Sequence, residues 1–264
     1  MLKTILLVSG LLLSLNSLAT NTPRELAEQS VQLSGMELFL QQAPVMLGRL
    51  LQAQQTRTDE EKALLKKASD RLQQQLQLDP LRTQLVNALM QGDRPDYLQQ
   101  MNSALSSPLA NAMNEKEKQA GSADGRQRLN EYREKVKLNP PRGVRVELVQ
   151  RLDKASRTSD ISVLLRTELM RSIQQAADLL TQRPAGSREE EGARDQQLHE
   201  QLEARTRQQV ESFFLYAYRQ VPTRQLEQYV QLYEAEPTQW FVEQCIAAIK
   251  AFFKTQRATF ADTP

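Results

Sequence analysis

The sequence predicts an all-α protein made of two related multi-helix halves that pack as a helical bundle. Good helix formers such as Gln, Leu, Ala, Glu and Arg dominate the 264 residues, and glycine occurs only nine times. No run of β-branched residues predicts a strand, whereas apolar residues recur at helical spacing along most of the chain. The apolar pattern of the first half also recurs in the second at an offset of 129 positions.

This recurrence predicts an internal duplication, in which the two halves bury apolar faces against each other. The corresponding positions, given as pairs in chain order, are Met36/Leu165, Leu40/Leu169, Leu47/Ala176, Leu50/Leu179, Leu51/Leu180, Tyr97/Leu226, Met101/Val230, Ala104/Tyr233 and Pro108/Pro237. They agree in apolar pattern more than in identity. The predicted organisation is a signal peptide at 1–19, a first half at 20–125, a charged helix and proline-rich linker at 126–143, and a second half at 144–264.

The N-terminus has the features of a secretory signal peptide. Lys3 precedes an apolar run at 5–15, and Ser17-Leu18-Ala19 fits the small-x-small pattern of a signal-peptidase site. A membrane anchor is the alternative, but this run is shorter than the roughly 20 residues that span a bilayer. We expect cleavage after Ala19 and a periplasmic or secreted mature protein.

Helix boundaries in the first half follow from caps and prolines. Residues 22–25, Thr-Pro-Arg-Glu, form a capping box that begins a short helix, and Ser34-Gly35 ends it. A second helix over 36–51 is expected to kink at Pro44, and a third begins with the acidic cap at 58–61.

Three short helices are expected between Pro80 and Ala120, followed by a break at 121–125. A strongly charged helix should cover about 126–137. The prolines of the segment 139–143 exclude a helix there, because each proline also restrains the residue before it.

The second half is expected to contain five helices. They cover about 144–155 and 161–180, then a long stretch reaching about Gln220, a short stretch after Thr223, and 237–257. Residues 183–194 combine Pro, Gly, Ser and three consecutive glutamates, which predicts an exposed polar loop.

The composition argues against several classes of function. The net charge is +2, with acidic and basic residues interspersed, so nucleic acid is not an expected partner. Cys245 is the only cysteine, which excludes an internal disulfide, and its apolar surroundings predict a buried thiol.

No pattern of catalytic or metal-binding residues is complete. His199 is the only histidine, and Glu203 stands where a zinc-protease motif needs the second. Gln196 stands where a helical di-iron motif needs a glutamate. The chain also lacks a Gly-x-Ser-x-Gly elbow and a glycine-rich phosphate loop. We therefore expect neither an enzyme nor a cofactor or metal; a hydrolase that uses helix-borne carboxylates is the least favoured alternative.

Aromatic residues are concentrated near the C-terminus. Between Phe213 and Phe260 the chain carries eleven of them, against three in the preceding part. Their helical spacing favours a tight core, but aromatic side chains are also favoured at interfaces. In the second interpretation Trp240, Phe252 and Phe253 are the candidate anchors for a partner.

Basic residues alternate with these aromatics at the end of the chain. Lys250, Lys254 and Arg257 are therefore candidate contacts for a membrane surface, which makes peripheral membrane binding an alternative function.

The helix-turn-helix units resemble a family of exported bacterial helical domains of unknown function, whose second helix closes on aromatic-Tyr-x-Ser-Pro-x-Gly. The segment 104–110, Ala-Leu-Ser-Ser-Pro-Leu-Ala, is similar to this motif, with Ala110 in place of the glycine. The segment 233–239 occupies the same place in the second half and keeps one aromatic and the proline. The resemblance implies a helical fold and export, and it implies no activity, substrate or catalytic residue.

The function expected from the sequence is protein–protein interaction in the cell envelope. Export, the absence of a complete catalytic pattern and the aromatic concentration together favour a scaffold, adaptor or chaperone-like role. The expected partner is an envelope protein or a folding client.

Overall fold

The fold is all-α, as the sequence predicts. The computed structural model describes residues 21–41, 43–52, 58–59, 62–63, 66–67, 70, 78–181 and 188–261, and these residues form helices joined by short turns, with no strand among them. The predicted signal peptide and most of the helix expected after Thr58 lie outside the described residues. None of the described helices combines the length and apolar character needed to cross a bilayer.

The first three helices are α1 (Pro23–Leu33), α2 (Met36–Leu40) and α3 (Ala43–Gln52). The predicted capping box is present: the Thr22 hydroxyl accepts from the Glu25 amide at 3.2 Å, and the Thr22 amide donates to the Glu25 carboxylate at 2.7 Å. Gly35 has a φ of +74°, which glycine adopts at little cost. The kink expected at Pro44 is instead a full break between α2 and α3, because proline lacks the amide that would continue the helix.

The three short helices predicted next are confirmed as α5 (Leu78–Gln91), α6 (Pro95–Leu105) and α7 (Pro108–Gly121). The break expected at 121–125 is limited to Ser122, because α8 (Ala123–Leu138) begins directly after it. The segment expected to be non-helical at 139–143 is non-helical over 139–142, and its last residue, Gly143, begins the next helix.

The second half contains α9 (Gly143–Ser156), α10 (Thr158–Thr181), α11 (Arg188–Ala217), α12 (Thr223–Glu234) and α13 (Glu236–Ala261). The polar loop expected at 183–194 was predicted too long, because α11 begins at Arg188.

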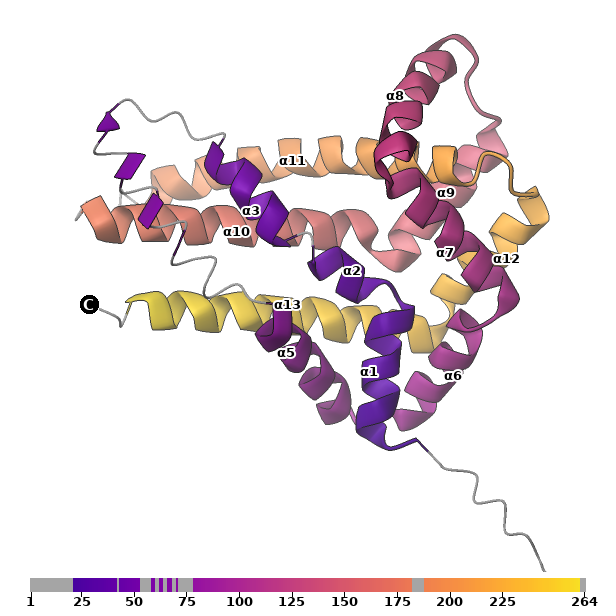
Figure 1. The fold of residues 1–264 in the computed structure, drawn as a ribbon, viewed down its shortest axis with the longest axis horizontal. Coiled ribbons are helices and arrows are strands. Elements are labelled where there is room, and N and C mark those ends of the chain that lie inside the picture. The colour runs from indigo at the N-terminus through magenta and orange to yellow at the C-terminus, as the bar shows by residue number, and fades with distance from the viewer. Residues whose placement is uncertain are drawn as a thin grey trace, which may run out of the picture.

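A first hydrophobic core joins the N-terminal helices to the C-terminal one. In Figure 1, α10, α11 and α13 run alongside one another, and α1, α5 and α6 lie below α13. Helix α13 packs on α5, α6 and α10. Helix α1 packs on α5 and α6. The buried residues of this core come from α1, α2, α3, α5, α6, α10 and α13.

A second hydrophobic core lies at the other end of the molecule. It is built from α7, α8, α9, α12 and the C-terminal end of α11, and α8 projects from the body above it (Figure 1). Each core thus takes helices from both sides of the linker at 126–143. The duplication and its boundaries stay predictions, because burial at paired positions follows from any amphipathic pattern.

Candidate functional site

The aromatic residues proposed as partner anchors pack within the protein. Phe252 and Phe253 are 5% and 0% exposed and belong to the first core. Trp240 is half-buried, with its ring edge-to-face on Tyr97 at a centroid distance of 5.9 Å. A Cβ added to Gly92 would lie 2.5 Å from Cζ2 of Trp240, so the indole also rests directly on the end of α5.

The three basic residues proposed to meet a membrane differ in their surroundings. Lys250 and Lys254 are exposed on α13. Arg257 instead forms an ion pair with the buried carboxylate of Glu168 on α10, which Arg171 also approaches at 3.3 Å. The Gln175 amide donates to the Arg257 carbonyl at 3.0 Å, so Arg257 holds α13 against α10.

The structure reveals a different candidate site, an open hollow of about 490 Å³ between the end of α7, the start of α8 and the end of α11. We call it the basic hollow. It is lined by Lys116, Lys118, Gln119, Ala120, Ser122, Asp124, Gly125, Arg128, Tyr216, Ala217, Arg219 and Gln220. Its volume is within the range of about 300–1,000 Å³ that is usual for ligand sites.

The α7–α8 corner that forms one wall depends on Ser122 and Gly125. The Ser122 hydroxyl accepts from the Gly125 amide at 3.0 Å and donates to the Gln119 carbonyl at 2.7 Å, so it caps both helices. A Cβ on Gly125 would lie 2.5 Å from the Ala120 carbonyl oxygen and closer still to that of Gln119. Glycine is therefore required for α8 to turn this tightly against α7.

The opposite wall is fixed by Arg145 of α9. Its guanidinium donates to the carbonyls of Val221, at 2.9 Å, and Tyr218. These bonds secure the end of α11 and the turn that follows. The neighbouring Arg219 donates to the Tyr216 carbonyl at 2.7 Å and lies 4.1 Å from the centroid of the Tyr216 ring.

The charge of the hollow is strongly asymmetric. Four cationic side chains line it against the single carboxylate of Asp124, an excess of three positive charges. Lys118 pairs with Glu115 at 2.7 Å, while Lys116 and Arg128 form no ion pair with any residue that the structure describes. These two cations can therefore bind an anionic group without first releasing another partner.

A carboxyl group and three tyrosines lie behind this wall. The Tyr218 hydroxyl donates to Oε1 of Glu117, and the Tyr229 hydroxyl lies 3.3 Å from the same oxygen and 3.2 Å from Oδ1 of Asn114. The Tyr233 hydroxyl lies 3.4 Å from that of Tyr229. Burial raises the pKa of Glu117, and the tyrosine hydrogen bonds offset part of this rise.

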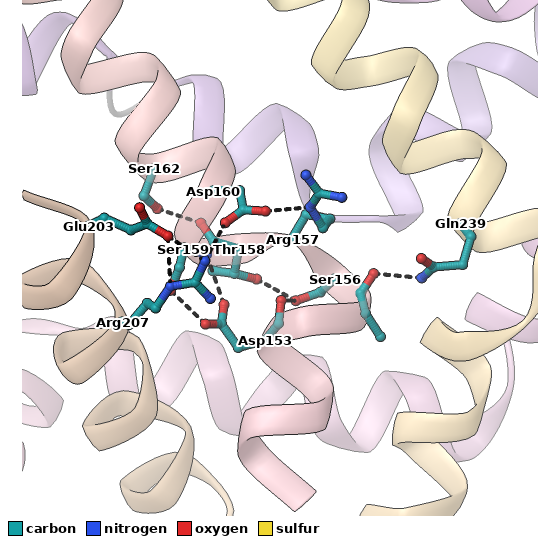
Figure 2. Close-up of polar contacts among 11 residues, drawn as sticks. Asp153, Ser156, Arg157, Thr158, Ser159, Asp160, Ser162, Glu203, Arg207 and Gln239 are labelled. Carbon is teal, nitrogen blue, oxygen red and sulfur yellow. Dashed lines mark hydrogen bonds and ion pairs between the residues drawn. The ribbon is translucent and has the colours of Figure 1, made fainter. Parts of the chain in front are cut away.

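A second polar cluster, at the α9–α10 corner, joins four helices (Figure 2). Asp153 accepts from the amide and the hydroxyl of Ser159 at 2.8 and 2.6 Å and so caps α10. Arg207 of α11 bonds to Asp160 at 3.1 Å, and Gln239 of α13 donates to the Ala155 carbonyl at 2.7 Å. These side chains mainly satisfy one another and the ends of the helices, so we interpret the cluster as a structural joint.

The single histidine and the single cysteine lie in different surroundings. His199 is exposed on α11, whereas Cys245 is fully buried, and burial raises the pKa of its thiol. In the described part of the chain, no three His, Cys, Asp or Glu residues are grouped closely enough to hold a metal ion.

Sequence reasoning did not single out the cations of the hollow or Glu117. A signal was present for Glu117: it follows Met113 by four residues and precedes Ala120 by three, so a carboxylate falls on the buried face of α7. No such local signal exists for Lys116, Arg128 and Arg219, because they come together from two helices and from a turn much later in the sequence.

Comparisons of this chain with family models, curated proteins and solved structures gave no match. The resemblance to an exported helical domain stays an expectation.

Proposed function

We propose that this protein acts without catalysis, by protein–protein interaction, and that the basic hollow receives an acidic segment of its partner. The observation that carries the proposal is the excess of three positive charges in one open hollow of a chain whose overall charge is only +2. Charge concentrated in this way favours anionic partners and speeds their association.

The form of the hollow favours a peptide segment over a compact anion. The cations come from α7, from α8 and from the turn after α11, so successive carboxylates can each meet one. The ring of Tyr216 and the side chain of Ala217 add apolar surface between them. Exposed ion pairs contribute up to about 1 kcal/mol each, so several acidic residues are needed for useful affinity.

We predict that Lys116→Glu combined with Arg128→Glu weakens the binding of a fluorescent hexa-aspartate peptide at least tenfold. The two substitutions reverse the charge of two hollow cations that have no described ion-pair partner, and both residues lie on helices. Fluorescence anisotropy in 50 mM salt measures the affinity, and added salt should weaken wild-type binding because exposed charges are screened.

Lys250→Glu combined with Lys254→Glu is the matched control. It changes the net charge by the same amount on exposed positions of α13, outside the hollow. Peptide affinity should then stay within about twofold of wild type. Equal weakening by the two pairs would show attraction to overall charge, and the hollow would lose its role.

The biological partner is proposed to be an envelope protein or a folding client. Capture from cross-linked envelope extract, with wild type and the Lys116→Glu/Arg128→Glu variant in parallel, tests this directly. One or two acidic proteins retained only by wild type would identify an adaptor or scaffold, whereas many unfolded clients would identify a chaperone. Equal retention of the same proteins by wild type and by the Lys116→Glu/Arg128→Glu variant would contradict binding in the hollow.

We also propose export with cleavage after Ala19. Mass spectrometry of the protein recovered from the envelope should find Thr20 as the first residue. An intact Met1 in that fraction would contradict the cleavage.

A further inference from the structure

The wall of the basic hollow has a titratable group on its inner side. Lys116 and Lys118 line the hollow, while Glu117 between them bonds to Tyr218, in the turn after α11, and to Tyr229 of α12. Across the hollow, lining residues again flank a residue that points inward. Tyr216, Ala217 and Arg219 line the hollow, whereas Tyr218 bonds to Glu117. Two short segments thus carry both the binding surface and the contacts of one carboxyl group.

Glu117 lacks a compensating positive charge. The groups that contact its carboxyl are the hydroxyls of Tyr218 and Tyr229, with Tyr233 hydrogen-bonded behind them. The nearby charged side chains come from α7, α8 and the turn after α11. They line the hollow or form an ion pair beside it, and they are Glu115, Lys116, Lys118, Asp124, Arg128 and Arg219. On α6, Asp96 bonds to Arg94 and Tyr97 to Glu236. Among the described residues no lysine or arginine forms an ion pair with Glu117.

We propose that Glu117 makes the basic hollow sensitive to pH, so that proton uptake by its carboxyl group strengthens binding of the acidic partner segment. This inference rests on the proposed function. An ionised Glu117 places a negative charge directly behind the lysines that attract the partner, and protonation removes it. By linkage, the bound segment must in turn favour the protonated carboxyl.

The response occurs where the acidic segment itself stays charged. Aspartate carboxyls in a flexible peptide have pKa values of about 3.9. Burial raises the pKa of Glu117 above the usual range of a glutamate, so Glu117 takes up its proton while the peptide is still ionised. Affinity therefore rises as the pH falls toward the pKa of Glu117.

The single histidine of the chain is far from the hollow. His199 lies 18 residues before Ala217 on α11, which is about 27 Å along the helix. At that distance its charge is screened at physiological ionic strength.

The test measures the affinity of hexa-aspartate between pH 5 and pH 8 at constant ionic strength. Wild type should bind about fivefold more tightly at the acid end, the size expected from one charge acting across the thickness of a helix. Glu117→Gln mimics the protonated carboxyl, so its profile should be flat, at the affinity that wild type reaches at the acid end. Glu131→Gln, at an exposed position of α8, makes the same charge change outside the hollow and should keep the wild-type profile.

Carbon-13 NMR of the Glu117 carboxyl group gives a second readout that does not depend on a variant. Its titration midpoint should move upward when the peptide is added. Matching pH profiles for wild type and Glu117→Gln, or a midpoint unmoved by bound peptide, would overturn the pH response and leave the hollow as a binding site. Absence of peptide binding at every pH would overturn the proposed function itself.

Discussion

Replacing Phe253 with alanine is expected to lower the free energy of unfolding by about 3–5 kcal/mol. The ring is fully buried in the first core, edge-to-face with Phe252 at a centroid distance of 5.5 Å. Its removal loses apolar burial and leaves a cavity that packed helices only partly fill. Urea unfolding followed by circular dichroism at 222 nm measures the change. Since domains are commonly stable by only about 5–15 kcal/mol, this is a large fraction of the total.

The neighbouring residue provides the control for this prediction. Lys254 is exposed, so Lys254→Ala should change stability by no more than about 0.5 kcal/mol. A cost below about 1 kcal/mol for Phe253→Ala, together with lost capture of a partner, would instead make this ring an interface anchor.

Replacing Gly125 with alanine is expected to cost at least about 3 kcal/mol, at or above the upper end of ordinary overpacking. The added methyl group would meet the carbonyl oxygens of Gln119 and Ala120, which are backbone atoms and cannot rotate away. Relief requires α8 to move from the end of α7, which also opens the wall of the basic hollow. Thermal unfolding should show the loss of stability, and hexa-aspartate affinity should fall by about tenfold.

Gly143→Ala is the matched substitution. Gly143 is the first residue of α9, and nothing lies within 4 Å of the position that a Cβ would take. Alanine there should leave stability unchanged or raise it by up to about 1 kcal/mol, because it reduces the freedom of the unfolded chain. Similar effects of the two substitutions would show that the α7–α8 corner is looser than described.

Local rules located most helix boundaries from the sequence. The capping box at Thr22 and the prolines that open α6 and α7 act within one turn of chain, so their residues suffice. The start of α11 was harder to predict, because glutamates at 189–191 suit both a solvated loop and a helix N-terminus.

Burial was less predictable than helix location. Phe252 and Phe253 belong to an apolar stripe on α13. The sequence pattern of this stripe is the same whether another helix of this chain or another protein covers it. The covering helices include α5, which lies more than 150 residues earlier in the sequence. The basic hollow depends in the same way on the packing of α7, α8 and α11.

The position of α13 affects how the chain can fold while it is being made. The first core includes side chains of α13, such as Phe241 and Ile249, together with those of α1 and α5. A chain that leaves the ribosome N-terminus first therefore cannot complete this core until the last helix has been synthesised. Contacts so distant in sequence slow folding and leave apolar surface open in the nascent chain. The helices made first acquire their final partners only after α13 has been made.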